Sequence, residues 1–562
     1  MTGRRWAIGM AVAAATLALM VATEPKMAIV WDEGFVLGRQ ARIRSWLRAL
    51  ADPPGFARTW TPPAPGSELV QQDIPPRPAP RADEIDTRGK LLSRPALDWF
   101  WPFAREEPHG HPPFYAIEGL IGDVLTPGRP DLQRARLGPM LAFSVAAGVL
   151  WWFAARRWGG WGASLAAGAW ALQPNLFGHG HYATVDALLT SLWLLALVAF
   201  AEAVDTDRRS PRWGWAILFG MICGMAADSK LTGWFLPLPF LAWSVLYRDR
   251  RGLLALLAGG VAGALTLYAF GPPFWGDLVG GLERFFRSNL TRGRTIPIPV
   301  QFLGRIYDTP RESLPWYNTV AWTALVTPVG FLGLSLAGAA RALASFGKRT
   351  GPVDERARRI ERVGVLAVMH WGFLLALRAM PHTPGHDGVR LFLPAFGMLA
   401  IAAGSGAAWA VERWGRAGKV LVALALAEGA VAVAVMMPVP LSYFSPIAGG
   451  LPGAARLGME PTYFWDGLTD DALDWINANT PPGRTVRFAT FPTSWLYLKQ
   501  SGKLTAALAP IDPGRPMWLV IQNRPGALGP VERNLLTRGT PAYVVRKLGV
   551  PLVLIYPYPD GT

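Results

Sequence analysis

Long apolar runs separated by short polar stretches dominate the first 440 residues of the sequence. Each run is close to the roughly 20 residues that a helix needs to cross the hydrocarbon core of a bilayer. The pattern predicts about eleven transmembrane helices, near residues 6–23, 137–155, 161–176, 184–203, 213–228, 231–247, 252–271, 318–340, 363–380, 389–411 and 420–440. Asp228 and Lys230 interrupt the apolar stretch between residues 213 and 247, and the helix count depends most on how this interruption is read.

The polar segments between these helices fall into two classes by charge. With a cytoplasmic N-terminus, the inner segments are "MTGRR", "ARRWGG", "DTDRRSPR", "YRDRRG", "ASFGKRTGPVDERARRIER" and "ERWGRAGK", all rich in Arg or Lys, as cytoplasmic loops are. An odd number of helices then puts the C-terminus outside, in a multi-pass protein of the plasma (inner) membrane. Residues 1–23 begin like a signal peptide, but the many later spans favour an uncleaved first helix.

Three large segments lie outside on this topology: a first outer loop at 24–136, a second loop at about 272–317, and residues 441–562. In the first loop, Val36, Ile43, Leu47 and Leu50 share one face of a predicted helix that is suited to the membrane interface. The Pro-rich stretch at 51–81 predicts an irregular segment. A second short helix is expected in "HGHPPFYAIEGLIGDVL".

The last 120 or so residues differ in character from the rest of the chain. "TDDALDWINAN" predicts a helix with Thr469 as its N-cap, and "TVRFAT", "MWLVIQN" and "PLVLIYPY" predict short buried strands. We therefore expect two domains: a transmembrane domain over residues 1–440, which includes the first outer loop, and a small α/β domain over residues 441–562 on the outer face.

The composition agrees with a polytopic membrane protein. Hydrophobic residues make up 51% of the chain and charged residues only 17%, whereas charged residues make up about 25% of soluble domains. The net charge of +16 is explained by the basic inner loops, so nucleic acid is not an expected partner. The single cysteine, Cys223, lies in an apolar run and gives no information on the redox compartment.

Many ionisable residues fall on the outer side. They are the carboxylates Asp32, Glu33, Asp186 and Asp387, the cations Lys230 and Arg390, and the histidines His111, His181 and His386. Each alone can be a solvated loop residue or an interfacial side chain. Together they suit the transfer of a group from a lipid phosphate. A carboxylate can deprotonate an acceptor hydroxyl, and Lys or Arg can hold the phosphate.

"HGHPP" and "GHGHY" have H-x-H spacings that resemble those of metal ligands, and carboxylates suit magnesium or manganese. This signal is weak. The requirement for a divalent metal stays open, and no other cofactor is indicated.

Several stretches, taken in order, resemble the polyprenyl-phosphate-dependent glycosyltransferases of the GT-C superfamily, which include protein O-mannosyltransferase-like proteins and the bacterial aminoarabinose transferase of lipid A. They are "WDEGFVLGRQAR", "HPPFYAI", "QPNLFGHGHYATVDALLTSLWL", "AADSKLTGWFLPL" and "HDGVRLFLPAF". "YFSPIAGGLPGA" and "YFWDGLTDDALDWINAN" resemble the start of the outer domain of bacterial members. The resemblance covers nearly the whole chain.

The resemblance implies roles for five of these residues. Asp32 matches an active-site carboxylate of the first outer loop, Glu33 completes the pair, and Asp186 matches a second acidic residue. Lys230 and Arg390 resemble basic residues near the lipid phosphate. The aminoarabinose transferase has an acidic-basic pair before its "PP", where this chain has Gly110 and His111. A metal ligand at that acidic position is therefore in doubt.

The expected protein is an inverting hexosyl- or pentosyltransferase. It would pass a sugar from a polyprenyl-phosphate donor to a hydroxyl of a lipid, glycan or protein, with Asp32 as base or acceptor anchor. Two other classes remain open. A transporter of a lipid-linked or anionic solute would also have many spans, but with ions near the membrane midplane. A membrane sensor or scaffold would use the C-terminal domain for binding.

Overall fold

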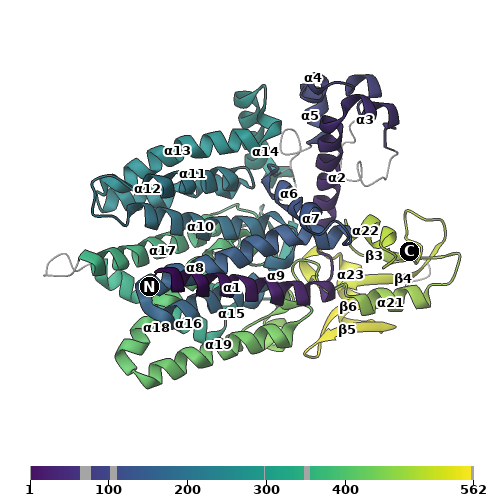
Figure 1. Cartoon of the computed structure of the whole chain (residues 1–562). Helices are drawn as coiled ribbons and strands as arrows, with labels where there is room; N and C mark the ends of the chain where they lie inside the picture. The colour runs from purple at the N-terminus through teal and green to yellow at the C-terminus, as the bar shows by residue number, and fades with distance from the viewer. Residues whose placement is uncertain are drawn as a thin grey trace.

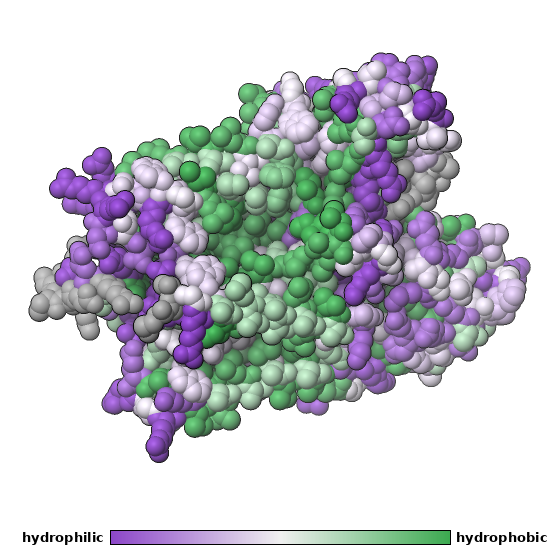
Figure 2. All heavy atoms as spheres, viewed as in Figure 1, coloured by the Kyte–Doolittle hydropathy of each residue, from purple (hydrophilic) through white to green (hydrophobic). Residues whose placement is uncertain are grey.

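A computed structural model describes residues 2–63, 78–101, 111–295, 298–309, 311–346 and 355–558. Its long helices run alongside one another, with the N-terminus at one end of the bundle and the C-terminal segment at the other (Figure 1). On the face shown in Figure 2, a broad apolar band crosses the middle of the bundle and separates two polar ends. We call these the N-terminal end and the C-terminal end. This arrangement confirms an α-helical polytopic membrane protein.

The bundle consists of α1 (Thr2–Thr23), α8 (Asp131–Ala171), α10 (Val185–Val204), α11 (Trp213–Ala227), α12 (Pro237–Leu246), α13 (Arg250–Phe270), α15 (Asn318–Val326), α16 (Val329–Phe346), α17 (Glu355–Ala379), α18 (Pro394–Trp414) and α19 (Arg416–Met436). Gly159 has a left-handed backbone (φ 70°) that interrupts α8, so this element covers two of the predicted spans. The predicted span at 318–340 is broken between α15 and α16, and the one at 389–411 begins as α18 only at Pro394.

Within the described residues, seven helices are long and apolar enough to cross a membrane, and three shorter apolar helices lie at 213–227, 231–246 and 329–345. All eleven predicted spans map onto these elements. The number that cross the bilayer stays a prediction.

Small residues let the helices approach closely. Gly220 and Gly224 on α11 face Gly259 and Gly263 on α13, and a Cβ added at Gly220 would lie 2.5 Å from the Gly259 Cα. Such small-residue contacts are typical of helix pairs in membranes. Nearly all of α10 is buried, which puts it in the interior of the bundle.

The first outer loop contains the predicted helix as α2 (Trp31–Ala51), which runs across the direction of the long helices (Figure 1). Val36 and Ile43 are buried, but Leu47 is exposed, so only part of the predicted apolar face is covered. Short helices follow: α3 (Pro53–Thr59), α4 (Arg88–Leu91), α5 (Arg94–Phe100), α6 (Phe114–Gly119) and α7 (Ile121–Leu125). Contrary to the prediction, the Pro-rich stretch at 51–81 is not irregular throughout, because α3 lies in it; its residues 64–77, and His109 with Gly110, lie outside the described residues.

The second outer loop contains α14 (Leu278–Thr295) and an antiparallel hairpin, β1 (Ile298–Phe302) and β2 (Arg305–Thr309), which were not predicted. After α19 come α20 (Gly450–Arg456), α21 (Asp470–Asn479), α22 (Trp495–Gln500) and α23 (Pro530–Arg538). These helices accompany a four-stranded sheet in the order β3-β4-β6-β5.

The predicted strands are confirmed as β3 (Arg484–Phe488), β4 (Arg515–Gln522) and β6 (Val550–Pro557); β5 (Tyr543–Lys547) was missed. β3 and β4 are parallel, and the other pairs are antiparallel. Thr469 occupies the predicted N-cap position of α21, but its hydroxyl contacts the Asp471 carboxylate instead of capping a backbone N–H. The domain boundary near residue 440 stays a prediction.

Candidate active site

The "HDG" turn before α18 presents Arg390 to a cluster of carboxylates. Asp387 (φ 62°) and Gly388 (φ 56°) are consecutive left-handed residues, a strained turn for the aspartate. The ring of Tyr463 packs on Gly388 so closely that a Cβ there would lie 2.9 Å from it. A short 3-10 turn, η5 (Arg390–Phe392), then leads into α18.

Arg390 lies among three aspartates from three parts of the chain. Its Nη1 lies 2.9 Å from Asp32 Oδ2 and 3.1 Å from Asp387 Oδ2, and its Nε lies 3.1 Å from Asp186 Oδ2. The side chain of Asp32 is 23% exposed, while those of Asp186 and Asp387 are 2% and 9% exposed. Asp32 is therefore the carboxylate of the three that an incoming molecule can reach most easily.

Lys230 approaches the same cluster from the break between α11 and the 3-10 turn η3 (Leu231–Phe235). Its Nζ lies 2.5 Å from Asp186 Oδ1, so Asp186 bridges the two predicted phosphate-binding cations. The break after α11 also receives the first outer loop, because the Phe114 N–H donates to the Asp228 carbonyl oxygen (2.9 Å).

The C-terminal segment adds a cation and a fourth carboxylate. Arg524 Nη2 lies 2.8 Å from Asp387 Oδ1, and Arg524 Nε lies 3.5 Å from Glu460 Oε2. Burial raises the pKa of Asp387, but Arg390 and Arg524 outweigh it and lower the pKa to about 2. Burial raises the pKa of Glu460 to about 7 against the opposing effect of Arg524. The cluster thus combines three aspartates and three cations with Glu460, whose carboxyl has a pKa near neutral.

Aromatic side chains form one wall of the cluster. The Arg390 guanidinium lies 4.6 Å from the ring centroid of Phe464, and the Arg524 guanidinium lies 4.9 Å from that of Trp465. Behind them, Tyr463 donates to Asn175 Oδ1 (2.6 Å) and lies 3.2 Å from His179 Nε2. The stretch "YFWD" therefore belongs to this site as well as to the start of the C-terminal segment.

Glu33 lies apart from the Arg390 cluster. It is fully buried, and its two oxygens each lie 2.7 Å from Arg136 of α8. The Ala183 N–H donates to Oε1 (3.0 Å) and the Val30 N–H to Oε2 (3.1 Å). This bidentate pair joins the start of α2 to α8 and to the loop before α10. Glu33 is placed to position Asp32, not to face a substrate.

The three predicted histidines lie in different surroundings. His386 Nε2 lies 3.8 Å from Asp387 Oδ2, at the edge of the cluster. His181 donates from Nδ1 to the Phe177 carbonyl oxygen (2.6 Å), and its Nε2 lies 3.0 Å from Thr23 Oγ1, so it joins α9 (Pro174–His181) to the end of α1. His111 is buried against the ring of Tyr115.

Sequence reasoning missed Arg136, Arg524, Glu460 and His179. Only "YFWD" and "GHGHY" drew attention to segments near them. Arg524 follows β4 in a loop with no recognisable motif.

The described residues do not form a metal site. None of their His, Cys, Asp and Glu side chains gather in groups of three or more suited to hold an ion. The three aspartates converge on the Arg390 guanidinium, which occupies the position between them.

The chain was compared with known proteins. The family described as dolichyl-phosphate-mannose-protein mannosyltransferase matches residues 112–275, and no curated protein sequence matches. Crystal structures of ArnT from Cupriavidus metallidurans, one apo and one bound to undecaprenyl phosphate, are similar over 98% of this chain and 97% of theirs, at 15% identity and a TM-score of 0.50. Archaeal oligosaccharyltransferase AglB from Archaeoglobus fulgidus is similar over 75% of this chain and 62% of its own, at 13% identity and a TM-score of 0.42.

Residues 112–275 are thus similar to a family of polyprenyl-phosphate-dependent mannosyltransferases, and nearly the whole chain has a fold similar to that of ArnT, in line with the resemblance of its motifs to GT-C glycosyltransferases. The similarity in fold extends along almost the whole length of ArnT.

Proposed function

We propose that the protein transfers a sugar from a polyprenyl-phosphate-linked donor to a hydroxyl group of a lipid, glycan or protein. The observation that carries the proposal is the position of Asp32: a partly exposed carboxylate held on Arg390, beside the Asp186–Lys230 pair and at the end of membrane-length helices. If these helices span the bilayer, the site lies at the level of the lipid headgroups, where a lipid phosphate is found. The ArnT structure bound to undecaprenyl phosphate has the same fold.

The reaction is a displacement at the anomeric carbon. Asp32 accepts the proton of the acceptor hydroxyl as its oxygen bonds to that carbon. The bond from the carbon to the phosphate oxygen breaks, and polyprenyl phosphate leaves with the electron pair. Attack from the face opposite the phosphate inverts the anomeric centre. Either a hexose or a pentose donor fits this scheme.

Lys230 and Arg390 are the candidate groups for the donor phosphate. Both already contact carboxylates, so an arriving phosphate shares or displaces these contacts. Displacement of Asp32 from Arg390 would release the carboxylate toward the acceptor when the donor is bound. Donor binding would in this way free the Asp32 carboxylate to act as the base.

We place this end of the protein outside the plasma membrane, because the opposite end carries the Arg- and Lys-rich segments. The acceptor would then be a component of the cell envelope.

The test uses radiolabelled polyprenyl-phosphate sugars, hexosyl and pentosyl, added to the purified full-length protein in proteoliposomes. A transferase releases polyprenyl phosphate and places the label on an acceptor from an envelope extract. A transporter moves the label across the bilayer unchanged, and a sensor or scaffold does neither. Movement of intact donor without transfer would overturn the proposal.

A further inference from the structure

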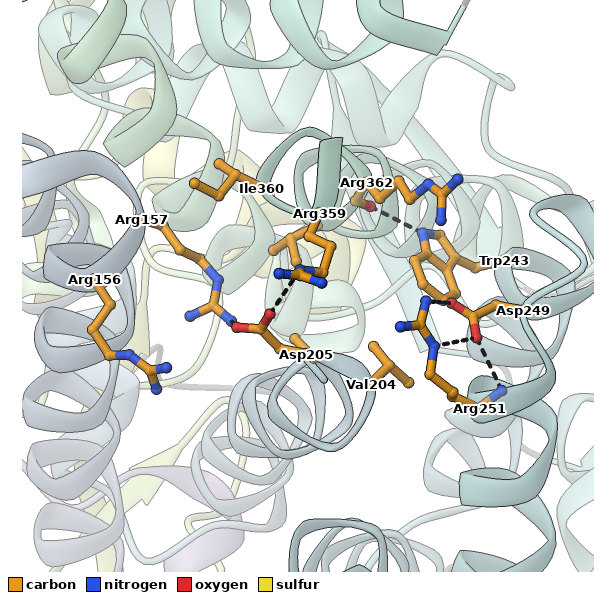
Figure 3. A pocket seen from close by; sticks show the side chains of 12 residues that line it. Arg156, Arg157, Val204, Asp205, Trp243, Asp249, Arg251, Arg359, Ile360 and Arg362 are labelled. Carbon is orange, nitrogen blue, oxygen red and sulfur yellow. Dashed lines mark hydrogen bonds and ion pairs between the residues drawn. The ribbon is translucent and has the colours of Figure 1, made fainter. Parts of the chain in front are cut away.

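A second charged site lies at the opposite end of α10. Asp186 lies in the first turn of this helix and Asp205 follows its last residue, so the two lie roughly 28 Å apart along the helix axis. Around Asp205 is a cavity of about 200 Å³. Its lining contains five arginines from three helices: Arg156 and Arg157 of α8, Arg251 of α13, and Arg359 and Arg362 of α17 (Figure 3).

The cavity has a surplus of positive charge. Asp205 and Asp249 are the two acidic residues of the lining, against five arginines, which leaves a net charge of +3. Asp205 lies 3.5 Å from Arg157 and 3.2 Å from Arg359. Asp249 holds Arg251 through two contacts of 2.8 and 3.0 Å. These two aspartates thus fix the directions of three arginines. Outside the lining, Asp207 also pairs with Arg359, and Glu202 pairs with Arg156 and Arg157, so the positive surplus is smaller than the lining alone gives.

Arg362, the fifth arginine of the cavity lining, differs from the other four in its contacts. Its guanidinium lies 4.8 Å from the ring centroid of Tyr247, and it makes no ion pair with any residue that the structure describes. Its backbone carbonyl accepts from Trp243 Nε1 (2.9 Å), which fixes Trp243 in the wall of the cavity (Figure 3). A guanidinium fork of this kind suits the oxygens of a phosphate group.

The other side chains of the lining distinguish the cavity from a row of basic loop residues. Ala201, Val204, Ile360 and Val363 supply apolar surface beside the arginines. Arg157 is only 5% exposed. Behind the cavity wall, the fully buried Glu202 holds Arg156 and Arg157 at 2.7 and 2.9 Å. The basic side chains therefore line a partly open space between helices, the kind of place where anionic lipid headgroups bind in other membrane proteins.

We propose that this cavity binds a phosphate group, carried by an anionic lipid headgroup or present as free phosphate. The inference is independent of the proposed transferase activity, because the cavity and the Arg390 cluster lie at opposite ends of α10. A zwitterionic headgroup is disfavoured, since its ammonium group would enter a positively charged cavity.

The test compares the full-length protein with two variants. In Arg359→Gln/Arg362→Gln, Asp205 keeps Arg157, so no buried carboxylate loses its last partner. The control is Arg341→Gln/Arg413→Gln, which removes the same charge from exposed residues at the same end. Native mass spectrometry measures the binding of dioleoylphosphatidylglycerol and dioleoylphosphatidylcholine. A thermal shift with inorganic phosphate, against chloride at equal ionic strength, tests free phosphate.

We expect phosphatidylglycerol to bind in preference to phosphatidylcholine. The double variant should weaken its binding by roughly 30-fold, because each arginine near an anionic headgroup contributes about 1 kcal/mol. The control should change binding by less than about fivefold. Stabilisation by inorganic phosphate that is lost in the double variant, without a lipid preference, would also support the site and assign it to free phosphate. Equal lipid and phosphate binding in the wild type and the double variant would overturn the proposal.

If the double variant fails to fold, Arg362→Gln alone keeps the test decisive. It breaks no ion pair among the described residues, and it should weaken binding by about fivefold.

Discussion

Asp32 and Glu33 are adjacent in the sequence but lie in different environments. Asp32 is partly exposed and contacts Arg390, while Glu33 is buried on Arg136 with backbone N–H groups on both oxygens. One turn of α2 therefore supplies both the proposed base, Asp32, and the buried ion pair that anchors the start of the helix. The two residues should respond differently to loss of charge.

For Asp32→Asn we expect transfer per folded molecule to fall by about 100- to 10,000-fold, because the amide cannot act as a base. Membrane insertion and melting temperature should change little. The measurement is turnover of radiolabelled donor, normalised to monodisperse protein. Asp308→Asn, an exposed carboxylate at the same end, is the matched control. A fully active Asp32→Asn enzyme would remove this loop from the active site.

For Glu33→Gln we expect loss of stability before loss of activity. The substitution leaves the buried Arg136 with Glu24 as its remaining carboxylate partner (3.0 Å). Breaking a buried ion pair from one side costs about 3–5 kcal/mol. Melting temperature and yield should fall. Turnover per folded molecule should fall only as far as a displaced Asp32 side chain would reduce it. A stable but inactive variant would instead assign Glu33 a chemical role.

Arg390→Lys tests the centre of the cluster. A lysine ammonium keeps the charge but cannot contact three aspartates from two nitrogens of a planar group, as Arg390 does. We expect kcat/KM for the donor to fall roughly 10- to 100-fold, the range for the loss of one or two charged hydrogen bonds. Arg311→Lys, which alters an exposed ion pair, serves as control. Unchanged donor kinetics would exclude Arg390 from the site.

At the scale of elements, Glu460 joins β1 to the turn after β4. Its Oε1 accepts from the N–H groups of Gln301 (3.2 Å) and Gly526 (3.0 Å). Its pKa is raised from 4.5 to about 7. Between these two pH values the folded protein keeps a proton on Glu460 that the unfolded chain has already released. The stability contribution is complete below about pH 4.5 and is lost as the pH rises through 7.

The melting temperature of the wild type should therefore fall by a few degrees between pH 5 and pH 8 because of this group. Glu460→Gln mimics the protonated form and should flatten the dependence over this window. Differential scanning fluorimetry in detergent measures both curves. Identical pH profiles for the two proteins would show that Glu460 is ionised throughout.

The elements that could be predicted from the sequence are those whose position follows from the local pattern of apolar and charged residues. Hydropathy located the spans, and the charge of the loops brought Asp186, Lys230 and Arg390 to one end, where the structure joins them. Arg136 and Arg524 were missed because their partners, Glu33 and Asp387, lie more than 100 residues away in the chain. A buried ion pair of this kind leaves no periodic signal.

At the scale of the whole molecule, the bundle separates two charged sites. Arg390 and Arg524 at the C-terminal end are balanced by aspartates, whereas the cavity at the N-terminal end keeps a surplus of arginine. The balanced site suits a reaction that creates and moves charge. The unbalanced one suits the cytoplasmic side of a membrane, where anionic lipid is concentrated.

This asymmetry gives the last prediction, which concerns orientation. A reporter fused after Thr562 should be active outside the cytoplasm, and one inserted near Arg250 should be active inside, because basic segments are retained on the cytoplasmic side. Alkaline phosphatase and green fluorescent protein fusions at the two positions measure this, with a fusion near Arg416 as a second inner control. The structure puts the N-terminus and the C-terminal segment at opposite ends of the bundle (Figure 1). If both reporters were on the same side, the number of membrane crossings between the N-terminus and Arg250 would be wrong, and the miscounted span would be the one at 213–247. A full inversion would put the Asp32 site in the cytoplasm and exclude an acceptor in the outer envelope.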